Sequence, residues 1–237
     1  KSKNNLMSNF VLLGYGRMGK RIQEIAEERG HRIVLATDHT PVSIPEIADA
    51  VINFSTPDSA FELVSLSLNQ GIPVISGTTG WDQLVPDAKK IALKNNTAFI
   101  YSSNFSLGVN LTFAVNKKLA ELLKPYPQYE VSIEEIHHKH KLDAPSGTAI
   151  SLAQPHIESK KLDGFQLGDS KEKLPIYSIR KVEIPGTHHV RYKSEIDKIT
   201  LSHEAYNRDG FALGSVIAAE WIVGKKGIFT MNDVLNL

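Results

Sequence analysis

The chain has no cysteine among its 237 residues. This absence excludes disulfide frameworks, thiolate nucleophiles and zinc–thiolate clusters, and it is in keeping with a reducing compartment. The sequence also lacks any apolar run near the roughly 20 residues that span a bilayer. Its first ten residues are polar and lack the apolar core of a secretory signal. We therefore expect a soluble, cytoplasmic, globular protein.

A charge imbalance is missing as well, because 27 basic side chains face 26 acidic ones and the formal net charge is +1. No global field therefore draws the protein to nucleic acid or to an anionic membrane, and neither is expected as a partner. The hydrophobic fraction of 41% and the length allow one large domain or two modest ones. Any concentration of positive charge must then be local, which indicates a site.

The first half of the sequence alternates short apolar runs with amphipathic stretches. The expected strands are residues 10–14, 31–38, 48–55, 72–77 and 97–103. The expected helices lie around residues 17–30, 59–71 and 81–96. Strands that alternate with helices of about 10–15 residues indicate βαβ units. We predict a Rossmann-like, doubly wound parallel sheet.

The pattern changes after about residue 106. One long helix is expected over 107–124, and residues 129–138 read as extended. Residues 174–206 read as two or three strands, and their alternation is typical of an antiparallel hairpin. This half therefore predicts an α+β domain with a mostly antiparallel sheet.

The end of the chain carries a strongly apolar helix over 211–224, which we expect to be buried on more than one side. We predict that it returns to pack on the first domain. The predicted domains are 1–106 with 209–237, and 107–208.

The segment GYGRMG, residues 14–19, lies between an expected strand and an expected helix. In G-x-G-x-x-G the first glycine allows a tight turn, the second lets the backbone approach a pyrophosphate, and the third permits close helix–strand packing. The N–H groups at the helix start would bind the phosphates. Asp38 ends the second strand, where a carboxylate would bond the ribose hydroxyls of NAD. The combination predicts a dinucleotide site, with a tight turn beside a solvated Asp as the alternative.

Other residues near this loop are less decisive. His39 could stack on adenine, assist a 2′-phosphate or do neither, so the choice between NADH and NADPH stays open. GTTG (77–80) and SSNFS (102–106) follow the fourth and fifth strands, where the sheet meets bound ligand. Their small hydroxylated residues suit a nicotinamide ribose or carboxamide, and ordinary loop chemistry is the alternative.

The segment HHKHK, residues 137–141, concentrates titratable positive charge. A metal site is disfavoured, because neighbours on a strand alternate faces, no acid within the cluster completes a three-ligand set, and two lysines repel a cation. We therefore expect no metal. Nucleic acid is disfavoured because neither a basic stripe nor a binding module is visible. A solvated surface cluster is the plainest alternative.

A site for an anionic substrate explains more. The segment DAPSGTA follows the cluster and reads as a turn leading into a helix, whose first N–H groups, from Gly147 and Thr148, would bind a carboxylate. His138 and Lys141 would add positive charge, and His137 could give a proton near neutral pH.

The stretch E-x-x-HH-x-x-K-x-DAPSGTA, in order after GYGRMG, GTTG and NFS, resembles the dihydrodipicolinate reductase family of bacterial lysine biosynthesis. The resemblance covers nearly the whole chain. It implies NAD(P)H-dependent reduction of 4-hydroxy-tetrahydrodipicolinate, a cyclic dicarboxylate, to tetrahydrodipicolinate with loss of water. It also implies a Rossmann domain completed by the C-terminal helix, and a second domain whose open mixed sheet builds a homotetramer.

The resemblance also implies roles for single residues. His137 would be the proton donor or acceptor, and Lys141 a second proton donor that contacts substrate. His138, Gly147 and Thr148 would hold the substrate carboxylates. The dinucleotide would be held by four segments and one arginine: Gly14, Tyr15, Gly16, Arg17, Met18, Gly19, Asp38, His39, Gly77, Thr78, Thr79, Ser102, Ser103, Asn104, Phe105 and Arg208.

The chain departs from the family pattern in two places. Its glycine loop is one residue shorter than the frequent form GxxGRMG. The chain is also shorter between 150 and 180, where Pro155 stands in the way of a continuing helix.

Two other functions compete with the reductase. A non-catalytic dinucleotide sensor would need an interaction module such as a DNA-binding one, and none is visible. Another NAD(P)-dependent oxidoreductase is the third hypothesis. An aldehyde oxidiser of the kind that forms a thiohemiacetal would need a cysteine.

Overall fold

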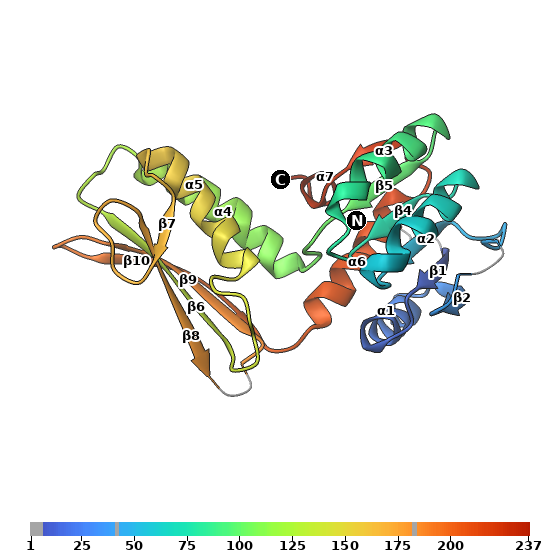
Figure 1. The fold of residues 1–237 in the computed structure, drawn as a ribbon, viewed down its shortest axis with the longest axis horizontal. Coiled ribbons are helices and arrows are strands. Elements are labelled where there is room, and N and C mark those ends of the chain that lie inside the picture. Colours follow the sequence, from blue (N-terminus) through green and yellow to red (C-terminus); the bar gives the residue numbers. More distant parts are fainter. Residues whose placement is uncertain (1–6, 41–42, 182–183) are drawn as a thin grey trace. The chain divides into compact units, whose positions relative to one another are not determined.

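The computed structural model describes residues 7–40, 43–181 and 184–237. The chain divides into two compact units, Lys1–Leu107 with Asp209–Leu237, and Gly108–Arg208 (Figure 1). No helix within the described ranges is both long and apolar enough to cross a membrane.

The first unit is built on a six-stranded sheet in which every pairing is parallel. The strand order is β11-β5-β4-β3-β1-β2. The strands are β1 (Asn9–Leu13), β2 (Arg32–Thr37), β3 (Ala50–Asn53), β4 (Val74–Ser76), β5 (Ala98–Tyr101) and β11 (Gly227–Phe229). The five predicted strands are confirmed; β11 was not predicted, because its three residues are too short to show a period.

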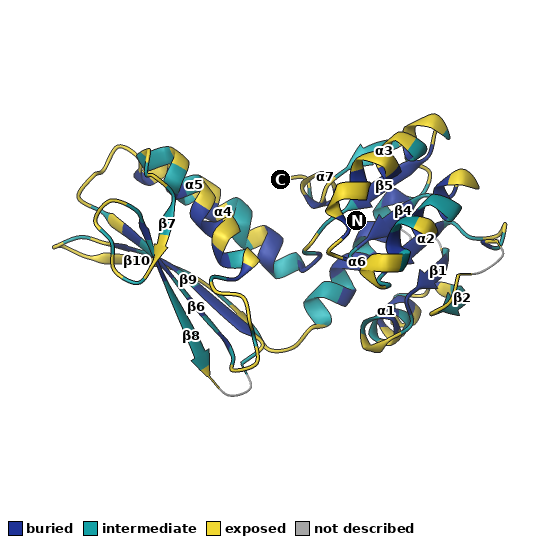
Figure 2. Ribbon diagram, in the orientation of Figure 1, coloured by how far each residue is buried: buried dark blue, intermediate teal, exposed yellow. Residues whose placement is uncertain are grey.

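Helices cover both faces of this sheet, which is why its strands read as continuous apolar runs. They are α1 (Arg17–Glu28), α2 (Pro57–Asn69), the short 3₁₀ helix η1 (Asp82–Leu84), α3 (Val85–Lys94), α6 (Asp209–Ile222) and α7 (Met231–Leu235). Phe10 and Leu12 of β1 pack in one core with Val216 of α6, while Val11 and Leu13 pack in the other with residues of α2 and α3. The central strands are accordingly buried (Figure 2). Each such side chain contributes about 1.5–3 kcal/mol by leaving water.

The predicted helix over 211–224 is confirmed as α6, and its apolar character has a packing reason. It lies against α1, β3 and β4. Gly214 allows the closest approach, since a Cβ atom there would lie 1.7 Å from the Phe105 carbonyl oxygen. Gly214 therefore lets this helix lie directly against the segment that follows β5.

The second unit has a five-stranded mixed sheet in the order β10-β9-β6-β8-β7. Its strands are β6 (Glu130–His138), β7 (Phe165–Leu167), β8 (Leu174–Lys181), β9 (Gly186–Lys193) and β10 (Lys198–Ala205). Its helices are α4 (Leu107–Leu123) and α5 (Gly147–Lys160). The sheet is mixed, as predicted. Its pairings β10–β9 and β9–β6 are antiparallel and β6–β8 and β8–β7 are parallel, so antiparallel pairing makes up half of the sheet and not most of it.

Strand β6 places the chemistry of this unit. Its buried positions are Val131, Ile133, Glu135 and His137 in strict alternation. The expectation over 129–138 is confirmed as a strand, but two polar residues continue its buried face. Helix α5 packs on β6 and β8, so Glu135 and His137 belong to the core side of the sheet.

Pro155 does not end the helix that contains it, contrary to the expectation from the sequence. Helix α5 runs through Pro155 to Lys160 and ends at Lys161 in the left-handed conformation, with φ +54°. The proline deprives the carbonyl of Ser151 of its helical hydrogen bond. Ser151 is exposed, so water can satisfy that carbonyl.

Candidate active site

The glycine loop of the first unit has three distinct geometries. Gly14 has φ +96°, and a Cβ atom there would lie 2.1 Å from the carbonyl oxygen of Phe54. A Cβ atom on Gly19 would lie 2.2 Å from the carbonyl oxygen of Gly14. A Cβ atom on Gly16 would meet nothing within 4 Å. The first and third glycines are therefore required by the fold, and the second leaves open space beside the backbone.

This loop fits a dinucleotide. Gly16 is the N-cap of α1 and offers no side-chain cap, and the first turn of α1 has no acidic residue. The first N–H groups of that helix remain for an anion such as a pyrophosphate. Asp38 follows β2, is exposed, and accepts a hydrogen bond from the Tyr15 N–H. The Asp38 carboxylate therefore lies directly beside the glycine loop.

Phe54, which the sequence analysis missed, joins several predicted cofactor segments. Its carbonyl oxygen lies against Gly14, and a Cβ atom on Gly77 would lie 2.3 Å from its ring. Its ring centroid is 5.9 Å from that of Phe105. The loops after β1, β3, β4 and β5 thus gather at the carboxyl edge of the sheet, the edge that binds ligand in doubly wound folds.

The predicted cofactor residues differ in what they can offer. Phe105 is 1% exposed, and Met18 packs against the core, so their side chains serve the fold. The Asn104 side chain stabilises the loop in which it lies, because its Oδ1 atom accepts a hydrogen bond from the Ser106 N–H at 2.9 Å. Arg208 is exposed and belongs to the second unit. The exposed side chains in this set are Arg17, Asp38, His39, Thr79, Ser103 and Arg208.

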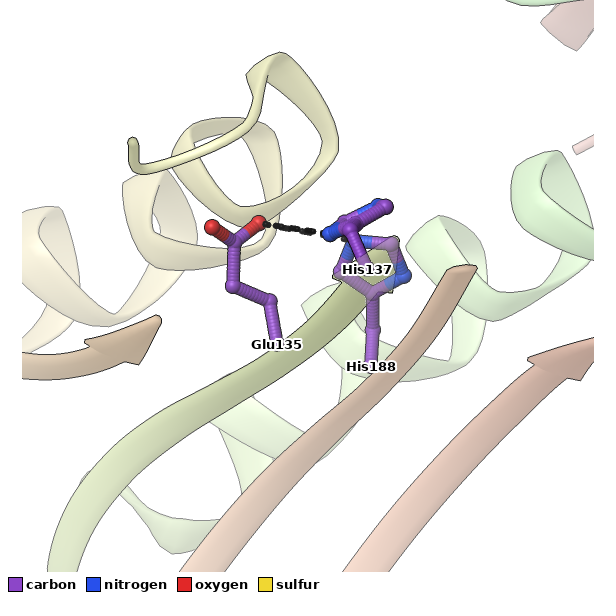
Figure 3. A group of neighbouring side chains, drawn as sticks. All are labelled: Glu135, His137 and His188. Atoms are coloured by element: carbon purple, nitrogen blue, oxygen red, sulfur yellow. Dashed lines mark ion pairs between the residues drawn. The ribbon is translucent and has the colours of Figure 1, made fainter. Parts of the chain in front are cut away.

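In the second unit, Glu135, His137 and His188 form one buried group, and Figure 3 shows the carboxylate facing the His137 ring. The Nδ1 atom of His137 lies 3.4 Å from Oε2 of Glu135. The His188 ring meets the His137 ring edge-on, with centroids 5.0 Å apart. Sheet register explains the grouping, because Glu135 pairs with His188 on β9.

The Glu135 carboxylate is fully buried yet well supplied with donors. Oε1 accepts from Ser178 Oγ at 2.8 Å and from Arg180 Nη2 at 3.2 Å, and Oε2 accepts the Ser146 N–H at 3.0 Å. Burial raises the pKa of Glu135, but hydrogen bonds from Ser146 and Ser178 and the nearby His137 outweigh it, so the pKa is lowered overall. Glu135 is therefore an anion at neutral pH.

The pKa values of the two histidines are lowered as well, which in a histidine favours the neutral form. Burial lowers the pKa of His137; Glu135 raises it, and Lys141 and Arg180 lower it. Burial also lowers the pKa of His188, to about 3. His188 is thus neutral, and its Nε2 atom lies 3.2 Å from Ser146 Oγ.

The same three residues have the composition of a metal site, since their ligand atoms lie within 4.8 Å of one another. Glu135 and His188 lie outside the segment 137–141, which by itself contains no acid that could complete a ligand set. The carboxylate nevertheless already accepts three hydrogen bonds and touches the Arg180 guanidinium. A cation would have to displace these donors and lie beside a fixed positive charge, so the group is better described as a hydrogen-bonded anion.

Lys141 follows the turn after β6. Its Nζ atom donates to both oxygens of Asp143, at 2.7 and 2.9 Å, and this lowers the pKa of Asp143. Arg180 fixes the same turn from β8: its Nη2 atom donates to the Asp143 carbonyl at 2.7 Å and its Nε atom to the Lys141 carbonyl at 3.4 Å. The turn that carries Lys141 is therefore held through its main chain.

Helix α5 begins where the sequence predicted. Ser146 is its N-cap, and its Oγ atom accepts the Ala149 N–H at 3.2 Å. The N–H groups of Gly147 and Thr148 belong to the first turn, where a helix offers no internal partner. Gly147 is exposed, so an anion can reach this end of the helix.

The structure brings together His137, Lys141 and the start of α5, but it does not bring His138 to the same face. His138 is the last residue of β6, half-buried, and its neighbour His137 points to the buried side. Its ring lies 6.4 Å from that of His140, centroid to centroid. Strand alternation separates the two adjacent histidines, as predicted.

Comparisons with known proteins now decide the family. Residues 8–105 match the model for the N-terminus of dihydrodipicolinate reductase, and residues 108–235 match the model for its C-terminus. The chain belongs to the dihydrodipicolinate reductase family. It is 50% identical over 234 residues to the 4-hydroxy-tetrahydrodipicolinate reductase of Christiangramia forsetii, covering 96% of this chain and 98% of that protein.

More distant relatives agree. The 4-hydroxy-tetrahydrodipicolinate reductase of Methanoregula boonei is 35% identical over 255 residues, covering 98% of this chain and 99% of that protein. Among solved structures, dipicolinate-bound dihydrodipicolinate reductase from Paenisporosarcina sp. TG-14 is similar, with TM-score 0.77 and 25% identity, covering 95% of this chain and 98% of that one. The resemblance stated from the motifs is confirmed.

Several residues of the site escaped the sequence analysis. Glu135 and Ser146 had local signals: the period-two face of β6 extends to position 135, and Ser146 stands at an N-cap position before a helix. No local pattern in the sequence marks Arg180 or His188 as a residue of the site. They reach the site from β8 and β9 only through strand pairing.

Proposed function

We propose that this chain reduces 4-hydroxy-tetrahydrodipicolinate to tetrahydrodipicolinate with NADH or NADPH, with loss of water, in the biosynthesis of diaminopimelate and lysine. The observation that carries this proposal is the gathering of a buried histidine, a lysine and an open helix N-terminus in one unit of a chain of this family. Such a group suits a small dicarboxylate that must be protonated as it is reduced.

The first unit supplies the cofactor site. Bound NAD(P)H would supply the hydride. Residues 1–106 and 209–237 form the proposed dinucleotide-binding domain, with the start of α1 for the pyrophosphate and Asp38 for the ribose. Open space at Gly16 and the Asp38 carboxylate beside Tyr15 support this assignment.

The second unit, residues 107–208, would bind the substrate. The N–H groups of Gly147 and Thr148 would hold one carboxylate, and Lys141 the other. The role expected for His138 is not part of this proposal, because its side chain lies on the other face of β6. His137 would exchange the proton at Nε2, since Nδ1 faces Glu135. Positive charge from Lys141 stabilises negative charge that builds up on the ring during reduction.

We further propose a homotetramer assembled through the mixed sheet, and a cytoplasmic location, where pyridine nucleotides are available. Helix α5 packs on one face of this sheet, and the other face carries half-buried side chains such as Tyr177 and Ile179. Light scattering coupled to size exclusion tests the assembly, and a monomer at micromolar concentration would overturn it.

The direct test is a coupled assay in which a dihydrodipicolinate synthase generates the substrate in place. We expect loss of reduced-nicotinamide absorbance that requires this substrate, with both cofactors compared at equal concentration. Dinucleotide binding without turnover would overturn the reductase proposal and favour a sensor.

A further inference from the structure

Glu135 is the most unusual residue of the second unit that the proposed reaction does not use. It is an ionised carboxylate with no exposed surface, in a strand face that otherwise buries apolar side chains and His137. Taking a charge out of water costs several kcal/mol unless partners replace the water. We therefore expect a buried charge of this kind to position neighbouring groups or to take part in catalysis.

The contacts of Glu135 reach His137, the N-cap of α5 and, through Arg180, the turn of Lys141. One oxygen faces His137 Nδ1 at 3.4 Å and accepts the Ser146 N–H at 3.0 Å, next to the first turn of α5. The other accepts from Ser178 and from Arg180. Through Arg180 the carboxylate is linked to the carbonyls of Lys141 and Asp143.

The register of the sheet makes these contacts simultaneous. Ser178 pairs with Glu135 and Arg180 pairs with His137 between β6 and β8. On the other side of β6, His188 of β9 pairs with Glu135. A single carboxylate therefore contacts groups from the turn into α5, from β8 and from β9.

The two nitrogens of the His137 ring face different surroundings. Its Nδ1 atom is buried and faces the carboxylate, although it lies beyond ordinary hydrogen-bond geometry. Its Nε2 atom lies beside Gly186, where an added Cβ would come within 3.1 Å. A glycine at 186 leaves room at the nitrogen that would meet substrate, and such contacts often tighten only when substrate binds.

We infer that Glu135 is a positioning residue of this reductase: it keeps a proton on Nδ1 of His137, so that Nε2 faces the substrate, is unprotonated in the neutral ring and donates its proton from the imidazolium. With Arg180 it also fixes the turn of Lys141 and the start of α5. This inference rests on the proposed function for its kinetic consequences. Its structural content, the tautomer of His137, does not depend on turnover.

The charge of Glu135 also sets where His137 titrates. The groups that act on it are Glu135 on its own strand, Lys141 and Asp143 on the following turn, Arg180 on β8 and His188 on β9. Glu135 and Asp143 raise the pKa of His137, whereas burial, Lys141 and Arg180 lower it. Removing the Glu135 charge must therefore lower this pKa further.

The kinetic test compares Glu135→Gln with Glu134→Gln. Glutamine keeps the size of Glu135 and removes its charge. Glu134 is the matched control, because it is adjacent on β6, points to the other face and pairs with Arg191 at 2.7 Å. We expect Glu135→Gln to lower kcat at least about tenfold, part of the roughly 10²–10⁴-fold that general acid catalysis provides.

The pH profile separates positioning from mere support of the fold. The inflection in kcat/KM that belongs to His137 should move to lower pH in Glu135→Gln and stay in place in Glu134→Gln. A lower kcat with an unmoved inflection would overturn the inference, since loss of stability alone does not change the titration of His137.

A second measurement uses the wild-type chain and covers the case in which Glu135→Gln fails to fold. In protein labelled with ¹⁵N-histidine, the signals of His137 are assigned by their absence in His137→Gln. We expect the tautomer protonated at Nδ1; a proton on Nε2 would overturn the inference. If wild-type protein shows no reductase activity, the proposed function fails, while this tautomer still decides the role of Glu135.

Discussion

The Nδ1 atom of His137 lies 3.4 Å from Oε2 of Glu135, two residues away on the buried face of β6. The relationship depends on the strand, because only a period of two places both side chains on one side. It gives a buried imidazole a fixed anionic neighbour. The proton chemistry proposed for His137 therefore has a defined orientation.

Replacing His137 with alanine should lower kcat by roughly 10²–10⁴-fold and change KM much less, because a proton is transferred mainly in the transition state. Steady-state kinetics with the coupled assay measure both constants. His140→Ala is the control, since His140 belongs to the same cluster but is exposed. An unchanged kcat would remove His137 from the mechanism.

Replacing Lys141 with alanine should lower kcat and raise KM, because the ammonium would stabilise charge on the ring and bind a substrate carboxylate. The matched change is Lys139→Ala, which removes an exposed lysine two residues earlier. If Lys141→Ala lowers only the melting temperature, the Lys141–Asp143 pair is a structural contact and the proposed role is wrong.

Replacing Asp38 with asparagine should lower the ratio of kcat/KM for NADH to that for NADPH, by about tenfold. A carboxylate accepts hydrogen bonds from ribose hydroxyls and repels a 2′-phosphate, and a charged hydrogen bond is worth about 1.5–3 kcal/mol. Asp87→Asn, an exposed site paired with Lys90 on α3, controls for a general loss of charge. Equal loss with both cofactors would contradict a selective role.

Alanine at Gly16 and at Gly19 should have different effects. In Gly19→Ala the new Cβ would meet the Gly14 carbonyl at 2.2 Å, so both the melting temperature and dinucleotide binding should fall. In Gly16→Ala nothing lies within 4 Å, so stability should hold while binding weakens. Thermal unfolding and titration with NADH measure the two effects. Wild-type affinity in folded Gly16→Ala would argue against a pyrophosphate at this loop.

His156 should make the protein less stable as the solution becomes acidic. Burial lowers its pKa to about 4, from 6.5, in a buried chain of hydrogen bonds with Tyr192 and Asn116. Between pH 6.5 and about pH 4, His156 is protonated in the unfolded chain and neutral in the folded chain. The free energy of unfolding therefore falls as the pH drops, by up to about 3 kcal/mol.

Urea unfolding at pH 7 and at pH 5 checks this prediction. His156→Gln should lose part of the difference between the two pH values, and His140→Gln, an exposed histidine, should keep it. The same difference in His156→Gln as in the wild type would show that His156 does not titrate as proposed.

Much of the fold was predictable because it depends on local signals. The apolar runs of the first half became β1 to β5, and GYGRMG opened α1 at the expected residue. Period-two alternation predicted β6, but only its apolar residues were assigned to a face, and Glu135 was therefore missed. The expectation that Pro155 would end its helix was wrong. The carbonyl that loses its hydrogen bond belongs to Ser151, which is exposed, and a helix tolerates a proline at such a position.

By itself, the sequence determined which residues could carry the chemistry: three glycines at loop spacing, an acid after the second strand, and histidine and lysine before a helix N-terminus. These depend on backbone conformations and periods that neighbours along the chain define. Only the tertiary structure decided that Ser178, Arg180 and His188 meet Glu135. Strand register is set by packing between segments far apart in the chain, and no local pattern encodes it.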